Sequence, residues 1–371
     1  MTDDRTPVRL AILGPGDVAR RDYLPEFHRI ADRAEIVAVC GRGEERARAA
    51  GESLGVPWFI DQTEMTETVE IDAVVNLTPI GVHERSTMAA LEAGLHVYSE
   101  KPLGVSVDGA VRLRDEAAAR GLVLVAAPSV LLFPQVQRVR RLLVEDTIGD
   151  VHTVRGLGFG GVPPWEGYGS DPGPFFATGA GPLVDLGVYP LHAITGLLGP
   201  ARRVSAMSVR TRDGFDIADG PLSGTRVPVE VDDAWAVTLD MGESWLATVE
   251  ANFTAHGTRA AELELMGECG TIALSLLDVS APIHVLDARG RWSTIEVETG
   301  RPTGGPDHIL GVEHLVDRIR GGRPPALSAD HAIHVIEILH AAARSAADGV
   351  VVELETAFDP ASFPTDARRS T

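Results

Sequence analysis

The sequence predicts an α/β domain built on a doubly wound parallel sheet, followed by an α+β domain with a large, open-faced and mostly antiparallel sheet. Residues 8–126 alternate short apolar runs with helical segments, which is typical of the first class. Residues 203–298 hold successive strand-like runs with no helix between them, which is typical of the second. A chain of 371 residues, 44% of them hydrophobic, can bury two cores. We expect domains at 1–127 and 128–358 and a tail at 359–371.

The first expected strand and the turn after it carry a dinucleotide-binding pattern. Val8–Leu13 is a short apolar run, as in a strand buried on both faces of a parallel sheet. It leads into a GxGxxA pattern, in which the first glycine permits a tight turn and the second lets a pyrophosphate approach the backbone. The pattern predicts a Rossmann domain and a helix that continues to about Arg33. The expected cofactor contacts are Gly14, Pro15, Gly16, Asp17 and Val18.

The second expected strand, Glu35–Cys40, ends in residues that favour NADP(H). An NAD site usually has an acidic residue here to bind the ribose 2′-hydroxyl, whereas a 2′-phosphate needs that carboxylate absent and an arginine nearby. This chain has Gly41 and Arg42 at that place, with Arg46 one turn further on. Arginine pairs readily with phosphate, so NADP(H) is favoured and NAD(H) is the alternative. An ordinary turn with a solvated arginine would also fit these residues.

The alternation of strands and helices continues to residue 126 and brings two further loops to the same edge of the sheet. Ligands of doubly wound sheets bind beyond the carboxyl ends of the strands. We therefore expect cofactor contacts from Leu77, Thr78, Pro79 and His83 after one strand, and from Glu100 and Lys101 after the next. The strands are expected at Ile71–Leu77, His96–Ser99 and Leu122–Ala126, and the helices at His83–Ala93 and Val107–Arg120.

Lys101 is the only lysine in the chain, beside thirty-two arginines. A guanidinium stays protonated in a protein, whereas a buried ammonium can release its proton. A lone lysine in such a composition is by itself most simply a solvated surface group. Its place at the carboxyl end of an expected strand, between Glu100 and Pro102, instead predicts a role beside the nicotinamide.

A second group of titratable residues lies on the helix expected at Leu183–Leu198. Asp185, Tyr189 and His192 are spaced i, i+4 and i+7, which places their side chains on one helix face. The positions around them are apolar, so this polar face is expected to point into a cleft; a purely structural role is the alternative. Pro190 is expected to distort the helix directly after Tyr189.

The loop at residues 160–176 is rich in glycine, proline and aromatic residues. Loops of this length within a compact domain are usually either functional or disordered. Two interpretations stay open, a substrate lid whose aromatic residues at 165–176 stack on a pyranose ring and a packed surface loop.

The strand-rich region that follows predicts an antiparallel sheet with one open face, a common dimer surface. A homodimer or homotetramer formed through this sheet is therefore expected. The expected strands are Arg203–Arg210, Asp233–Leu239, Trp245–Phe253, Ala260–Met266, Thr271–Leu276, Ile283–Leu286 and Trp292–Glu298. Two helices, His308–Arg320 and Ala329–Ala347, and a strand at Val350–Leu354 close the domain. His331 and His334 have metal-like spacing but no nearby acidic partner, so no metal site is expected.

Composition excludes several classes of partner. The formal net charge of −20 argues against nucleic acid and anionic membranes, both of which require a basic patch. The two cysteines, Cys40 and Cys269, lie far apart and show no metal or disulfide spacing. No apolar run approaches twenty residues, and the first residues do not form a signal sequence. A cytoplasmic protein with a small-molecule substrate is expected.

With Gly14–Ala19, Glu100-Lys101-Pro102 and Gly179–His192 in place, the chain resembles the glucose-fructose oxidoreductase / inositol dehydrogenase (Gfo/Idh/MocA) family over essentially its whole length. The resemblance implies NAD(P)-dependent hydride transfer that interconverts a hydroxyl and a carbonyl on a sugar, sugar derivative or polyol. It implies that Lys101 binds the reacting oxygen across a cleft from Tyr189, which exchanges the proton, and from Asp185, which orients both.

Two positions depart from the pattern of the inositol dehydrogenase branch. Tyr189 replaces its histidine, which is similar to the branch of glucose-fructose oxidoreductase and dihydrodiol dehydrogenase, where NADP is common. His192 stands where many members have aspartate, and its role stays open although we count it among the catalytic candidates.

The same fold allows two other functions. One is a non-catalytic dinucleotide-binding sensor, and the presence of Lys101, Asp185 and Tyr189 together argues against it, since binding alone does not need them. The other is NAD-assisted glycoside cleavage, in which the cofactor would stay bound through purification with no net change in NADPH. Fold analogy does not decide between these and a dehydrogenase.

Overall fold

The computed structural model describes residues 6–165, 167–218, 220–242, 245–299, 305–321 and 326–360, which form two compact units. The first unit holds the described residues of 1–129 and 308–336, and the second holds those of 130–307 and 337–360. The sequence-based division placed residues 308–336 in the C-terminal domain, whereas the structure packs them with the first unit. Apart from its first two residues, the expected tail lies outside the described residues.

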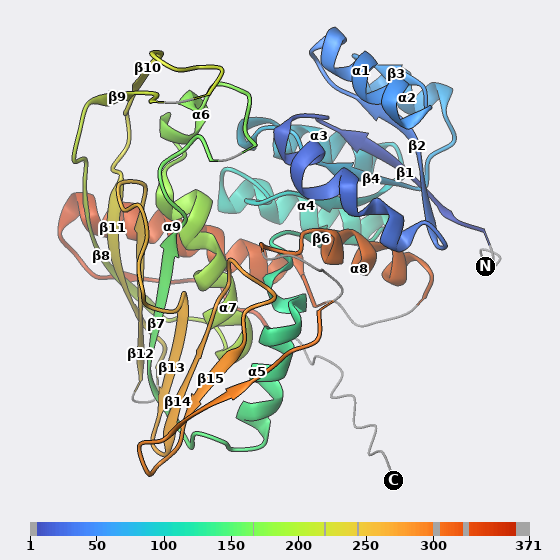
Figure 1. The fold of residues 1–371 in the computed structure, drawn as a ribbon. Helices are drawn as coiled ribbons and strands as arrows, with labels where there is room; N and C mark the ends of the chain where they lie inside the picture. The colour runs from blue at the N-terminus through green and yellow to red at the C-terminus, as the bar shows by residue number, and fades with distance from the viewer. Residues whose placement is uncertain are drawn as a thin grey trace. The chain divides into compact units, whose positions relative to one another are not determined.

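The first unit contains a six-stranded sheet with the order β3-β2-β1-β4-β5-β6 and all neighbouring strands parallel (Figure 1). This confirms the predicted doubly wound sheet. The central strands β1, β4 and β5 are mostly buried, as strands covered on both faces must be, whereas β2 and the edge strand β3 are partly exposed. They are β1 (Val8–Leu13), β2 (Ala34–Cys40), β3 (Trp58–Phe59), β4 (Ala73–Asn76), β5 (His96–Ser99) and β6 (Leu124–Ala126).

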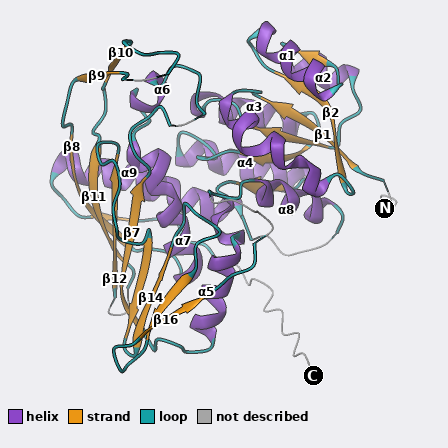
Figure 2. Cartoon of the chain, viewed as in Figure 1, coloured by secondary structure: helices purple, strands orange, loops and turns teal. Residues whose placement is uncertain are grey.

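The helices of this unit alternate with its strands (Figure 2), and local capping sets their ends. The side chain of Asp61 accepts a hydrogen bond from the Glu64 N–H at the start of α2, and Ser106 caps α4 through the Gly109 N–H. Gly121, with φ 65°, ends α4 in the left-handed conformation that glycine favours. The helices are α1 (Glu44–Leu54), α2 (Gln62–Thr68), α3 (Ile80–Glu92) and α4 (Val107–Arg120).

The first connection differs from the regular helix expected up to residue 33. It consists of one π-helical turn, η1 (Ala19–Tyr23), and a 3₁₀ segment, η2 (Leu24–Ile30). Pro25 lacks the N–H that would bond to the carbonyl of Arg21 in an α-helix, which explains why the α-helical ladder does not continue through this position.

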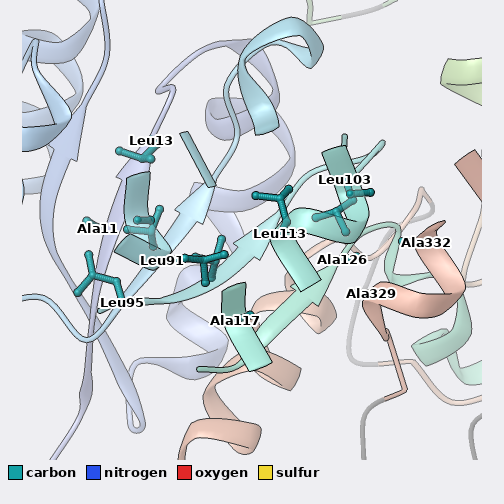
Figure 3. Close-up of a cluster of buried hydrophobic side chains, with 14 of the residues drawn as sticks. Ala11, Leu13, Leu91, Leu95, Leu103, Leu113, Ala117, Ala126, Ala329 and Ala332 are labelled. Carbon is teal, nitrogen blue, oxygen red and sulfur yellow. The ribbon is translucent and has the colours of Figure 1, made fainter. Parts of the chain in front are cut away.

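Long-range contacts explain why residues 308–336 join the first unit. The described residues of this range form α8 (Ile309–Ile319) and the first part of α9 (Ala329–Asp348). Arg33 donates to Glu313 and Asp317 on α8, at 2.8 Å in both cases. Ala329 and Ala332 belong to the same buried apolar cluster as the core of the parallel sheet (Figure 3).

The second unit contains a nine-stranded sheet, and its mostly antiparallel character is confirmed. Neighbouring strands are antiparallel except β7 and β12, which are parallel. Along β12 buried positions alternate with more exposed ones, so one face packs inward and the other is open. In sheet order the strands are β16 (Trp292–Ile295), β15 (Ile283–Leu286), β14 (Gly270–Leu274), β13 (Leu263–Gly267), β7 (Val151–Phe159), β12 (Leu246–Asn252), β11 (Ala234–Asp240), β8 (Arg203–Val209) and β17 (Val352–Glu353).

The remaining elements of this unit are short or helical. A separate two-stranded sheet, β9 (Gly214–Asp216) and β10 (Arg226–Pro228), was not predicted from the sequence. The helical elements are α5 (Pro134–Val144), α6 (Gly173–Phe176), η4 (Leu183–Gly187) and α7 (Val188–Leu198). Across the described parts of the whole chain, no helix has the length and apolar character needed to span a membrane.

Candidate active site

The turn after β1 has the geometry that a dinucleotide-binding loop requires. Gly14 has φ +79°, and a Cβ added there would lie 2.7 Å from the Leu77 carbonyl oxygen, so only glycine fits between the ends of β1 and β4. At Gly16 an added Cβ would meet no heavy atom within 4 Å, which leaves the backbone approachable. This cradle fits the pyrophosphate of a dinucleotide. Asp17 is buried and forms an ion pair with Arg20 on η1.

The end of β2 carries two exposed arginines. A Cβ at Gly41 would lie 2.7 Å from the Pro15 ring, so this glycine also lets the first loop pack against the end of β2. Arg42 and Arg46 are exposed, and neither forms an ion pair within the described residues. Both guanidinium groups are therefore available for an anionic ligand.

Asn76, which was not expected from the sequence to belong to the site, holds the loop after β4 through hydrogen bonds. Its buried side-chain oxygen accepts from the Thr78 N–H at 3.2 Å and from the Thr78 hydroxyl at 2.6 Å. Its amide nitrogen donates to the His83 carbonyl and to the Thr87 hydroxyl. The signal that could have revealed it is scarcity, because Asn76 and Asn252 are the only asparagines in the chain.

His83 is buried and connects the loops that follow β4 and β5. Its Nδ1 lies 2.9 Å from the Pro102 carbonyl oxygen and its Nε2 lies 2.5 Å from the Thr78 carbonyl oxygen. Burial lowers the pKa of His83, although both carbonyl contacts act to raise it. The structure thus gives His83 a clear role in holding these loops together, while the direct cofactor contact expected from the sequence stays a prediction.

Lys101 follows β5, next to a buried carboxylate. Glu100 accepts a hydrogen bond from the Lys101 backbone N–H at 2.9 Å, through Oε2. Its other oxygen, Oε1, accepts a hydrogen bond from the Tyr23 hydroxyl on η1. The Tyr98 hydroxyl lies 2.9 Å from that of Tyr23, and the His308 ring lies 5.6 Å from the Tyr23 ring between centroids.

Tyr23, Tyr98 and His308 were not among the residues expected from the sequence, because nothing local marks a buried tyrosine as a partner of a carboxylate 77 positions away. Burial raises the pKa of Tyr23 well above its usual value, with the Glu100 charge acting in the same direction. Burial also acts to raise the pKa of Glu100, but the surrounding positive charges and its two donors outweigh it and lower the pKa. Burial lowers the pKa of His308. The two hydrogen bonds indicate that Glu100 is a carboxylate.

The second unit positions the acid/base candidates. Asp185 lies on η4, and Tyr189 and His192 lie on α7; all three are buried, and none is without a partner. The predicted distortion by Pro190 exists but lies before Tyr189 rather than after it. The widened π-helical turn spans Leu183–Gly187, because a proline interferes with the carbonyl four residues earlier and not with the turn that follows.

Glycines let this helix approach β7 closely. A Cβ at Gly158 would lie 2.6 Å from the Gly187 backbone nitrogen, and one at Gly156 would lie 2.6 Å from Pro190 Cβ. At Gly187 an added Cβ would lie 2.8 Å from Leu183 Cδ1. These three positions have room for glycine only, and this sets the position of the helix segment that carries Asp185 and Tyr189.

The loop at 160–176 is packed through its aromatic residues. Trp165 contacts Tyr168, Phe175 and Phe253, with ring centroids 5.0–5.9 Å apart. Phe176 is fully buried and lies 5.3 Å from Phe253 between ring centroids. The described residues of this loop thus contribute to a buried cluster, as a packed surface loop would.

No group of three or more metal-ligating side chains occurs among the described residues. His331 and His334 are buried on α9, and both have partners.

Comparisons with known proteins identify the family. A family model described as an oxidoreductase family with an NAD-binding Rossmann fold matches residues 8–127, and the C-terminal domain model of the same family matches residues 136–273. The chain belongs to the GFO/IDH/MocA family. It is therefore an oxidoreductase, and its cofactor class is a nicotinamide dinucleotide.

Several GFO/IDH/MocA members resemble this chain. A dTDP-3,4-didehydro-2,6-dideoxy-alpha-D-glucose 3-reductase from Streptomyces violaceoruber is 34% identical over 60% of this chain, a match that spans 64% of the relative. D-glucoside 3-dehydrogenase from Escherichia coli is 27% identical over 94% of this chain and 98% of its own. The solved structure of an aldose-aldose oxidoreductase from Caulobacter crescentus has a TM-score of 0.78 at 21% identity, covering 94% of this chain and all of that one, which supports the fold.

Proposed function

We propose that this GFO/IDH/MocA protein interconverts a secondary hydroxyl and a ketone on a sugar or sugar derivative, with NADP(H) as the hydride carrier. The observation that carries the proposal is the placement of Lys101. The chain's only lysine follows β5, in the same unit as the dinucleotide-binding turn after β1, and its backbone is held by a buried carboxylate. Ligands of such sheets bind beyond these strand ends.

The protein's own residues manage charge and protons in this proposal. The bound nicotinamide supplies or accepts the hydride. Lys101 donates a hydrogen bond to the reacting oxygen and stabilises the negative charge that develops on it. Tyr189 exchanges the proton of the hydroxyl, and Asp185 orients the donors.

The preference for NADP(H) rests on the end of β2. Gly41 stands where a carboxylate would repel the 2′-phosphate, and the exposed Arg42 and Arg46 supply charge without an ion-pair partner among the described residues. An Arg42→Asp variant should lower the NADP/NAD ratio of kcat/KM by tenfold or more, as removal of a charge-assisted contact and addition of a repelling charge imply. An unchanged ratio would refute the assignment.

The proposed position of reaction is carbon 3 of a sugar ring, because the names of both relatives described above specify it. The test is a panel of 3-keto sugars, glycosides and nucleotide-linked sugars, each followed through NADPH absorbance with NADH in parallel. Activity confined to 3-keto compounds and their alcohols supports the proposal. Turnover only of substrates that react at carbon 1 would move the proposed position of reaction from carbon 3 to carbon 1. Cofactor that stays bound with no net absorbance change would favour glycoside cleavage.

We further propose that two or more copies associate through the open face of the nine-stranded sheet. Met207 and Val209 on β8 are 80% and 53% exposed, and Leu246 on β12 is 44% exposed. Apolar side chains exposed on an open sheet face are typical of an interface. A Met207→Asp variant should sediment as a smaller species than the parent protein.

A cytoplasmic location fits the cysteine chemistry. Cys40 and Cys269 are both unpaired. Burial raises the pKa of the Cys40 thiol to about 11, so it stays protonated and unreactive at neutral pH.

A further inference from the structure

We propose that Tyr23 is a positioning residue for Lys101, because its hydroxyl holds the Glu100 carboxylate that in turn holds the Lys101 backbone. The chain of contacts runs from the Tyr23 hydroxyl to Glu100 Oε1, and from Glu100 Oε2 to the Lys101 N–H at 2.9 Å. The kinetic consequence rests on the function proposed above, whereas the structural part can be tested without any substrate.

The direction of the hydrogen bonds follows from the number of protons available. A phenol has one hydrogen to donate, and that of Tyr23 goes to Glu100. The Tyr98 hydroxyl, 2.9 Å from the Tyr23 oxygen, must therefore donate to it. Tyr98 lies on β5, and Glu100 directly follows the last residue of that strand. Tyr98 thus orients Tyr23, and the Tyr23 hydroxyl bonds to the carboxylate.

Tight packing prevents these groups from changing conformation. Tyr23 and Tyr98 are fully buried, and their rings meet edge to face at 5.9 Å between centroids. On α8 a Cβ at Gly311 would lie only 2.4 Å from the Tyr98 ring, so the helix already presses against that tyrosine. The His308 ring covers Tyr23 from the residue just before α8. The packing therefore fixes the Tyr23 hydroxyl that bonds to Glu100, and Glu100 holds the Lys101 backbone through its other oxygen.

Charged and titratable groups from several elements act on this carboxylate and on its neighbours. His308 and Lys101 act on the charge of Glu100, and Glu100 acts on His83 of α3. Asp22 and Arg21 of η1 act on His308. The two hydrogen-bond donors act to lower the pKa of Glu100. Loss of the Tyr23 hydroxyl removes one donor, so the pKa of Glu100 rises and the carboxylate is neutralised at a higher pH.

The chain's single lysine makes this directly measurable. Protein grown with ¹³C-labelled lysine gives one Lys101 side-chain signal, whose position responds to the charge of the neighbouring carboxylate. As the pH is lowered, protonation of Glu100 should change the chemical shift of this signal. In a Tyr23→Phe variant, which keeps the ring beside His308, we expect the midpoint of that change to move to higher pH by about one pH unit. The value of kcat should fall about tenfold with little change in KM for the dinucleotide, and the acidic limb of the pH–rate profile should shift in the same direction.

Tyr98→Phe is the matched control, since it also removes one buried phenol oxygen but leaves the Tyr23–Glu100 bond. Tyr98→Phe should lower the thermal stability about as much as Tyr23→Phe does. It should move the pH midpoint of the lysine signal by less than a third as much. Equal movement in both variants, or none in Tyr23→Phe, would overturn the proposal. Glu100→Gln removes the titrating group and should abolish this change, which provides the test if Tyr23→Phe does not fold. Absence of turnover in the parent protein would contradict the proposed function and leave the lysine measurement decisive for Tyr23.

Discussion

The two units hold their candidate site residues by opposite means. In the first unit, polar groups fix Lys101: a buried carboxylate, two tyrosines and His83 tie the loops after β4 and β5 together. In the second unit, the absence of side chains fixes Asp185 and Tyr189, because glycines on β7 let η4 and α7 lie against the sheet.

The difference teaches which perturbations each unit should tolerate. A hydrogen-bonded buried charge responds to pH and to loss of a single donor, since an unsatisfied buried group costs about 1–3 kcal/mol. A helix set by backbone contact responds to added volume, since close-packed interiors do not accept an extra methyl group. The first unit is therefore expected to be sensitive to changes of charge and hydrogen bonding. The second is expected to be sensitive to added side-chain volume.

Replacement of Lys101 should have the largest effect. We expect Lys101→Ala to lower kcat by two or more orders of magnitude while dinucleotide affinity, measured by fluorescence titration, stays within about twofold. Lys101→Arg keeps the charge but not the compact ammonium, and should recover less than a tenth of the parent activity. Unchanged turnover in Lys101→Ala would remove this residue from the mechanism.

The volume side of the comparison is tested by Gly158→Ala. The added Cβ would meet the Gly187 nitrogen at 2.6 Å, where only backbone can give way. We expect a loss of about 1–3 kcal/mol in the free energy of unfolding, measured by denaturant titration, together with a lower kcat. Gly169→Ala is the control, because a Cβ there meets nothing within 4 Å. Similar values for the two variants would contradict the proposed packing role.

The two asparagines offer a matched pair across the units. Asn76 and Asn252 each accept hydrogen bonds from the N–H and hydroxyl of the threonine two residues on. Asn76 alone also donates to His83 and Thr87 in the interior. Asn76→Ala should therefore destabilise by about 2–3 kcal/mol and Asn252→Ala by about 1 kcal/mol. The reverse order, in thermal or denaturant unfolding, would show that the polar network of the first unit is less important than its geometry suggests.

Gly311→Ala should have a smaller effect and tests whether volume also matters in the first unit. The added Cβ would meet the ring of Tyr98, which can shift slightly, unlike backbone. We expect about 1–2 kcal/mol of destabilisation, offset in part by the better helix propensity of alanine. Gly81→Ala on α3, where a Cβ meets nothing within 4 Å, should be neutral or stabilising and serves as the control.

Features carried by short stretches of sequence could be predicted. The glycine pattern at residues 14–19, the strand that ends before Glu100 and Lys101, and the alternation of elements each depend on neighbours within a few positions, and the structure has all of them. The spacing of Asp185, Tyr189 and His192 predicted one polar helix face that points into a cleft. The structure places Asp185 on η4 and the other two on α7, all buried, and the cleft stays a prediction. The distortion expected directly after Tyr189 was predicted in the wrong place. It is the π-helical turn Leu183–Gly187, since a proline acts on the carbonyl four residues before it.

By itself, then, the sequence determined the class of fold, the glycine turn after β1 and the residues that carry charge. Only the tertiary structure decided what holds them. Tyr23 and His308 reach the neighbourhood of Glu100 from distant parts of the chain, residues 308–336 join the first unit through Arg33 and the apolar core, and Gly156 and Gly158 make room for a helix. The physical reason is that local propensity depends on adjacent residues, whereas a buried hydrogen bond or a missing side chain acquires meaning only from the atoms that folding brings against it.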